Sequence, residues 1–400
     1  MGDLLALIER QRAGWTLEAD FYLDAGVAAA ENDAIWHRRW LFAAHGCELA
    51  VTGAFVTLSI AGEPVVVVRG RDGVARAFAN VCRHRGSRIC TAASGRVHRL
   101  VCPYHAWSYD LDGRLLSDVS GHGGQAETLG LRPYATHEVG GLVFVSLADR
   151  PEDIAPLDRA FAPQLAPQGL TRARIAARAS YRVEANWKVV FENNRECFHC
   201  PVAHREYIRA NYDVHLTDPR RAEEIDARTA AEAKRWAELG LGAPSLVSDM
   251  TSEWYRINRT PLVPGFVTES LDGKPVAPVM GDYPEHDVGT LRVTVFPNFW
   301  MHGSGDHAVT TRLLPDGTGA TRVDVAWLVD AAAEEGRDYR VEALQPFWQL
   351  TSEQDWTICE NVQAGLRSRA YAPGPLERVK ERNVAQFIAW YLGLMRANRA

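Results

Sequence analysis

Residues 82–105 begin with Cys82-Arg-His84 and end with Cys102-Pro-Tyr-His105, with seventeen residues between the two pairs. Each pair offers one thiolate and one imidazole, and the intervening residues suffice for a β-hairpin that brings the pairs together. A structural zinc site is one interpretation, but zinc motifs usually place about two to four residues between paired cysteines and three to five between paired histidines. Because each pair here mixes the two residue types, a [2Fe–2S] centre with two Cys on one iron and two His on the other fits better.

The two loops resemble those that bind the cluster in Rieske oxygenases. The resemblance lies in CRHRGSRIC (82–90) and CPYHAWSYDLDGRL (102–115). It implies a Rieske [2Fe–2S] cluster with Cys82, His84, Cys102 and His105 as ligands. Neutral imidazoles in place of two thiolates remove negative charge, so such a cluster accepts an electron at a higher potential, ~−150 to +300 mV.

A second motif follows in residues 186–204, where Glu196 precedes His199 and His204. Histidines five residues apart on an unbroken helix would point ~140° apart. Pro201 should break that helix and let the two imidazoles converge. One alternative is a polar helix end whose histidines bind no metal. The other is two ligands of a 2-His-1-carboxylate triad, which leaves coordination positions open on non-haem Fe(II).

The spacing is similar to the iron motif of Rieske oxygenases, an acid followed three residues later by His and five later by a second His. The resemblance implies that His199 and His204 bind mononuclear Fe(II) and that Glu196 bridges the cluster of one subunit to the iron of its neighbour. In the family the third ligand commonly lies just before an apolar-Cys-Glu segment, and Asp355 occupies that place. Spacing alone also admits Glu353 and Glu360.

Cys197 and Cys200 form a CxxC pair, which can be a thioredoxin-like redox motif. That motif normally lies in a small βαβ unit, which this segment does not resemble, so we expect packing cysteines beside the iron. The N-terminal stretch carries acids within its apolar run and does not resemble a signal peptide. We therefore expect a cytoplasmic protein whose seven cysteines are reduced.

The composition, 400 residues with 46% hydrophobic and 24% charged, is that of a globular protein and excludes a disordered chain or a small disulfide-rich scaffold. The formal charge of −6 argues against a nucleic-acid partner. No apolar run reaches the ~18 residues of a membrane span, so no membrane partner is expected.

The predicted fold class is α+β. Short β-branched runs in residues 46–150 predict a small antiparallel β domain, and 174–184, 291–296, 308–314 and 321–329 predict strands of a second domain. Together with the resemblance, the expected organisation is N-terminal helices (1–45) packing on the catalytic domain, a Rieske domain (46–150), a linker (151–170) and an α+β helix-grip catalytic domain with the non-haem iron (171–400).

Three stretches are similar to glycine betaine monooxygenases and proline betaine (stachydrine) demethylases: residues 47–70, 80–90 and 192–204. The resemblance implies an oxygenase component that uses O2 to hydroxylate an N-methyl carbon, which then leaves as formaldehyde. It also implies a homotrimer supplied with electrons from NAD(P)H by a separate flavin/iron–sulfur reductase. Alternatives are hydroxylation of an aromatic or other small molecule, carnitine- or choline-type monooxygenation, an electron carrier and a zinc-binding module.

A quaternary ammonium group cannot donate hydrogen bonds, so its recognition depends on aromatic faces, each worth ~0.5–2 kcal/mol. The catalytic half offers several aromatic candidates: Tyr255, Phe266, Phe296, Phe299, Trp300, Trp327 and Trp348. Of these we expect Tyr255, Phe299 and Trp300 in the substrate pocket, together with His302 as a polar donor for a substrate carboxylate.

Overall fold

The computed structural model describes residues 2–118, 128–212, 219–241 and 254–398. Its helices are α1 (Gly2–Arg10), α2 (Asp20–Leu23), α3 (Ala25–Glu31), α4 (Ala155–Leu165), α5 (Trp187–Asn194), α6 (Cys200–Ala203), α7 (Arg205–Ala210), α8 (Pro219–Glu238), α9 (Val341–Leu344), α10 (Pro346–Leu366) and α11 (Arg382–Ala397). Within the described ranges, none is both long and apolar enough to cross a membrane.

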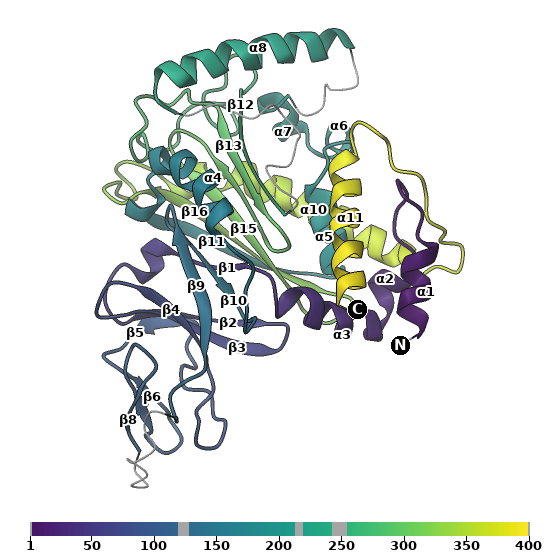
Figure 1. Ribbon diagram of the computed structural model, residues 1–400. Coiled ribbons are helices and arrows are strands. Elements are labelled where there is room, and N and C mark those ends of the chain that lie inside the picture. The colour runs from purple at the N-terminus through teal and green to yellow at the C-terminus, as the bar shows by residue number, and fades with distance from the viewer. Residues whose placement is uncertain (1, 119–127, 213–218, 242–253, 399–400) are drawn as a thin grey trace.

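Three antiparallel sheets organise the part of the chain that the structure describes (Figure 1). The largest has the order β1 (Leu41–His45), β10 (Leu142–Ser146), β9 (Pro133–Val139), β4 (Ala75–Ala79), β3 (Glu63–Arg69), β2 (Ala54–Ile60), β5 (Ser94–Arg96). A small sheet contains β6 (Leu100–Val101), β7 (Ser108–Tyr109) and β8 (Leu115–Ser117). The third has the order β11 (Ala173–Val183), β16 (Thr321–Asp330), β15 (Ala308–Pro315), β14 (Phe299–Gly303), β13 (Thr290–Val295), β12 (Tyr255–Thr260).

Strand β3 separates two hydrophobic cores because its side chains alternate between the faces of the sheet. Val65 and Val67 belong to the main core, which is shared with the third sheet and the helices. Val66 and Val68 belong to a smaller core that also contains the predicted cluster ligands Cys82 and Cys102. The cluster loops are thus packed on their own core. These sheets and cores agree with the α+β architecture and the N-terminal Rieske domain that the sequence predicts.

A buried ionic group ties the N-terminal helices to the catalytic helices. The carboxylate of Glu31 on α3 lies 2.6 Å from Lys188 Nζ on α5 and accepts hydrogen bonds from Trp187 and from Tyr391 on α11. Burial lowers the pKa of Lys188, against the opposing effect of Glu31. Because both charges are buried, loss of either partner would cost ~3–5 kcal/mol. The network anchors the start of α5, the helix that leads to the predicted iron ligands.

Two segments differ from the organisation of the chain that the sequence predicts. Residues 41–45, expected among the N-terminal helices, form strand β1, which pairs with β10 at the edge of the largest sheet. All five of its residues are buried, so the continuous apolar run belongs to a strand covered on both faces and not to a helix. The expected linker 151–170 contains α4, which buries Leu157, Phe161 and Leu165 at helical spacing.

Candidate metal centres and active site

The two predicted cluster loops have the same backbone conformation. The N–H of Gly86 donates to the carbonyl of Cys82, and the N–H of Ala106 donates to the carbonyl of Cys102, both at 3.0 Å. Gly86 and Ala106 both have positive φ, 76° and 59° respectively. Each loop therefore turns back sharply four residues after its cysteine, which places the histidine of the pair at the tip of the loop.

The four predicted cluster ligands lie together with the sulfurs inside and the imidazoles outside. Cys82 and Cys102 are 3% and 2% exposed, whereas His84 is exposed and its ring centroid is 4.6 Å from that of His105. The hydroxyl of Tyr109 is 3.3 Å from Cys82 Sγ. Two thiols and two imidazoles converging from paired loops are the donor set of a Rieske cluster, and hydrogen bonds to its sulfurs tune the potential.

Local hydrogen bonds favour the thiolate form of Cys102. Burial raises the pKa of this thiol, but hydrogen bonds from the Tyr104 backbone and from Cys82 outweigh burial and lower the pKa. Because a metal binds the thiolate, the loop is prepared for coordination.

The predicted iron motif lies in a broken helical segment. Residues 186–199 have the composition of a helix, but α5 ends at Asn194, and α6 begins only at Cys200 with Pro201 in its first turn. His199 and His204 therefore flank α6 on either side, and their ring centroids are 5.0 Å apart. Pro201 does not break a helix between the histidines, as the sequence suggested, because it lies in the first turn of α6, where proline is tolerated. The chain leaves helical conformation before Cys200 and at His204, and these two breaks bring the imidazoles onto one site.

Asp355 on α10 meets both histidines. Its Oδ1 is 3.2 Å from His199 Nε2 and 2.9 Å from His204 Nε2. Ligand atoms at right angles around a first-row metal, each at ~2.1 Å, would be ~3 Å apart, so the three groups fit one facial triad. The two alternative third ligands have other partners. Glu353 contacts Tyr181 and Gln349, and Glu360 accepts a hydrogen bond from the backbone N–H of Glu184.

The outer nitrogens of both histidines are held by hydrogen bonds. His199 Nδ1 is 2.6 Å from Glu196 Oε1, and His204 Nδ1 is 2.8 Å from Gln354 Oε1. Such bonds fix the ring orientation and leave Nε2 for the metal. Burial lowers the pKa of His199, but the hydrogen bonds to Asp355 and Glu196 outweigh burial and raise it to about 10. A metal that binds His199 through Nε2 therefore has to displace the proton from Nε2.

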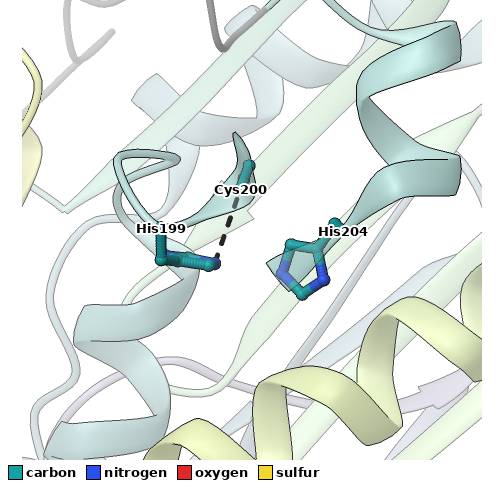
Figure 2. A group of neighbouring side chains, drawn as sticks. All are labelled: His199, Cys200 and His204. Atoms are coloured by element: carbon teal, nitrogen blue, oxygen red, sulfur yellow. Dashed lines mark hydrogen bonds between the residues drawn. The ribbon is translucent and has the colours of Figure 1, made fainter. Parts of the chain in front are cut away.

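Cys197 and Cys200 form a disulfide in the structure, which corrects the prediction of reduced packing cysteines. The turn before α6 brings their Cα atoms to 5.0 Å, a separation that a disulfide can bridge. Figure 2 shows His199, Cys200 and His204 around one site. Cys200 Sγ is 3.9 Å from His199 Nε2, but a sulfur bonded to Cys197 is not a thiolate ligand, so the carboxylate of Asp355 completes the triad better.

A cavity of about 130 Å³ opens beside the triad. Of the expected substrate residues, Trp300 and His302 line it. Tyr255 and Phe299 do not: side chains alternate along a strand, and these two point to the opposite face of the sheet. There Tyr255 packs on Phe161, and Phe299 packs on Phe42 at 4.3 Å between ring centroids.

Trp348, one of the aromatic candidates, lines the cavity. Several other residues that line it were not predicted from the sequence: Arg195, Tyr207, Arg256 and Arg292. Tyr207 follows His204 by three residues on α7, a helical spacing that could have identified it. No spacing in the sequence identifies Arg256 and Arg292. The face of the sheet that they occupy depends on the register of β12 with β13.

Glu269 positions one wall of the cavity. This carboxylate is 1% exposed; it accepts a hydrogen bond from Trp348 Nε1 at 3.2 Å and lies 3.4 Å from His302 Nδ1. The His302 and Trp348 rings lie 4.2 Å apart. Burial raises the pKa of Glu269, but His302, Arg292 and His307 together outweigh burial and lower the pKa. The buried Glu269 carboxylate therefore contacts the rings of His302 and Trp348, which line the cavity.

Residues 39–121 match the Rieske [2Fe-2S] domain family, and residues 170–397 match the family of ring hydroxylating alpha subunits, catalytic domain. The glycine betaine monooxygenase oxygenase subunit of Chromohalobacter salexigens is 40% identical over 98% of this chain and 89% of its own. Its Pseudomonas aeruginosa counterpart is 37% identical over 94% and 88%.

Two solved structures show the same fold. The quaternary ammonium Rieske monooxygenase CntA aligns with a TM-score of 0.74 and 22% identity over 96% of this chain and 97% of its own. Naphthalene 1,2-dioxygenase from Rhodococcus aligns with a TM-score of 0.69 and 18% identity over 98% and 97%. The chain therefore belongs to the Rieske non-haem iron monooxygenases, as the oxygenase subunit with a [2Fe–2S] cluster and a mononuclear iron.

Proposed function

We propose that this oxygenase subunit removes an N-methyl group from a quaternary ammonium substrate of the glycine betaine or proline betaine type. One observation carries the proposal: the rings of Tyr207, Trp300 and Trp348 line the same cavity as the histidines and the carboxylate of the triad. Relatives named for glycine betaine and carnitine oxidation support it.

The aromatic wall suits a trimethylammonium group. Such a cation has no N–H to donate, so it gains most from π-faces in a partly desolvated cavity. Tyr207 and Trp348 lie 5.8 Å apart between ring centroids and are nearly perpendicular, at 67°. Two faces set at that angle form the corner of a cage, and Tyr207 also lies 6.3 Å from the ring of His204. A cation held there would be next to the metal ligands.

We assign His199, His204 and Asp355 as the ligands of the mononuclear iron. Iron in this site supplies the place where O2 is activated, using electrons that the Rieske cluster delivers singly. The three groups and the aromatic rings line the same cavity, so the rings would hold a methyl group of the substrate beside the place where the iron would bind. Hydroxylation of the methyl carbon uses O2, two electrons and two protons and releases water; the hemiaminal then separates into formaldehyde, a proton and the demethylated amine.

We assign Cys82, His84, Cys102 and His105 as the cluster ligands. Figure 1 shows β6 and β8, which flank the second cluster loop, near the lower end of the molecule and α6 and α7 near the upper end. We infer that the chain acts as a homotrimer in which the cluster of one copy serves the iron of another. Glu196 would be the bridge, because it is hydrogen-bonded to His199 and its side chain is still 14% exposed. A separate flavin/iron–sulfur reductase would supply the electrons.

Metal analysis and product detection test this proposal. The purified protein should be brown and contain ~3 iron atoms per chain, two in the cluster and one in the triad. With NADH, a surrogate reductase and O2, glycine betaine or proline betaine should yield one formaldehyde per turnover. Zinc as the sole metal would contradict the metal assignment. Hydroxylation of an aromatic compound without formaldehyde from any betaine would contradict the substrate assignment.

A further inference from the structure

Given the assignment of His199, His204 and Asp355 as ligands of one metal ion, on which this step rests, we infer that the Cys197–Cys200 disulfide decides which metal the site prefers. With the disulfide closed, the donors are two imidazoles and one carboxylate, a set that suits Fe(II). With the disulfide reduced, the thiolate of Cys200 becomes a fourth donor, and the site suits zinc.

Cys200 already lies close to the position of a fourth ligand. Its Sγ is 3.9 Å from His199 Nε2, and one possible ligand atom from each of His199, Cys200 and His204 lies within 4.8 Å of the other two. Figure 2 shows these three side chains around one site. In a tetrahedral zinc site, with Zn–S of ~2.3 Å and Zn–N of ~2.0 Å, a sulfur and a nitrogen lie ~3.5 Å apart. A small movement of the freed sulfur therefore completes the coordination.

Ligand type and charge favour zinc in the reduced state. Zinc binds four nitrogen, sulfur or oxygen donors in a tetrahedron, and soft thiolates select it. Zn²⁺ with one thiolate, one carboxylate and two neutral imidazoles carries no net charge, which suits a site where Cys200 and His204 are 3% and 1% exposed. The sulfur would also fill a coordination position that a triad leaves open on Fe(II).

The histidines keep their orientation in both redox states. His199 lies within the loop that the disulfide closes, between Cys197 and Cys200. Its Nδ1 is held by Glu196, and Nδ1 of His204 is held by Gln354. Neither hydrogen bond uses a sulfur atom, so opening the disulfide adds a donor without removing the other three.

The disulfide is placed where a reductant can reach it. Cys197 is partly exposed and lines the cavity together with the buried Cys200. A thiolate of a small dithiol would therefore attack Cys197 Sγ and release Cys200 as the leaving thiolate. The second sulfur of the dithiol then displaces Cys197, so two electrons and two protons pass to the cysteines and the dithiol becomes a cyclic disulfide. Zinc binding releases the proton of the Cys200 thiol.

Zinc-edge X-ray absorption of the protein with its cluster in place tests this metal switch. The mononuclear iron is exchanged for zinc in two samples, one oxidised in air and one reduced with dithiothreitol that is removed before zinc is added. Zinc in the oxidised sample should have only nitrogen and oxygen neighbours at ~2.0–2.2 Å, and zinc in the reduced sample should gain about one sulfur at ~2.3 Å. Mass spectrometry after alkylation determines the state of Cys197 and Cys200 in each sample.

Two matched variants distinguish the sulfurs. Cys197→Ser leaves Cys200 as a free thiol, so zinc should have one sulfur ligand with and without dithiothreitol. Cys200→Ser should have no sulfur ligand in either condition. Competition with a chelator should show tighter zinc binding by reduced than by oxidised unmodified protein. That comparison needs no substitution, so it decides the question if a variant does not fold, and the visible spectrum of the cluster reports an intact protein.

Identical zinc neighbours in oxidised and reduced unmodified protein would overturn the switch, as would a sulfur ligand in Cys200→Ser. Cysteines 197 and 200 that both stay reduced in air would also overturn it. The triad assignment has a separate test, because oxidised His199→Ala should bind no zinc. Zinc that remains bound to this variant would refute the triad, whereas normal zinc binding that is lost only in His199→Ala, without a sulfur in the reduced state, would refute the switch alone.

Discussion

The cluster loops contribute all four assigned ligands from one stretch, Cys82 to His105, whereas the triad joins His204 on one helical segment to Asp355, 151 residues further along the chain. The loops turn through their own backbone hydrogen bonds and pack on a separate small core. The triad depends on α5, α6 and α10 docking in the main core. The cluster site can therefore be lost while the triad persists, and variants of each site can test whether the two are independent.

The largest effect should come from His105→Ala. Removing one imidazole should abolish the cluster, so the protein loses its brown colour and ~2 of ~3 iron atoms per chain, and turnover falls to background. Because the cluster loops pack on their own core, the triad should still bind one iron. Iron analysis, visible absorption and electron paramagnetic resonance check this outcome. Loss of all iron would show that the two centres depend on each other.

His199→Ala is the converse change. The protein should lose ~1 iron atom per chain and all product formation, while the visible spectrum of the cluster persists. The expected loss of activity exceeds the 10- to 100-fold range typical of changes to residues that only support a metal ligand. Formaldehyde release and spectroscopy on the same sample measure both effects. Disappearance of the cluster spectrum would mean that His199 has a structural role.

Glu196→Gln should have a smaller effect, because the amide keeps a hydrogen bond to His199 but loses the charge. Turnover should fall about 10- to 100-fold with iron content unchanged. Stopped-flow oxidation of the reduced cluster in the presence of substrate and O2 should slow in parallel. If turnover falls while cluster oxidation keeps its rate, Glu196 acts on substrate or iron and not as the bridge between centres.

The smallest effects should come from neighbouring residues on opposite faces of β14. Trp300→Leu removes an aromatic face and should raise KM for glycine betaine about 2- to 30-fold. Phe299→Leu should leave KM unchanged and lower the free energy of unfolding by about 1 kcal/mol, since it only repacks the core beside Phe42. Steady-state kinetics and denaturant unfolding of the pair measure the contrast. A similar rise in KM for both variants would contradict the strand register.

The sequence predicted β11, β13, β15 and β16 well, and the last three are rich in β-branched residues. It did not predict β12 and β14, whose mixed composition gives no comparable signal. Those two strands carry Arg256, Trp300 and His302, so the missed strands line the cavity together with the predicted strand β13. The choice of Tyr255 and Phe299 failed for the same reason: residue type suggests an aromatic cage, but only register decides which face a side chain occupies.

What the residues alone determined is the chemistry of the two metal centres, because ligand type and short-range spacing are properties of the chain itself. The pairs in residues 82–105 and the motif at 196–204 are readable without a fold. The tertiary structure decided which of three acids reaches the histidines, how the N-terminal helices join α5, and that Arg195 donates to Thr294 on β13. Those contacts link distant segments, and they exist only after the sheets and helices have packed in one register.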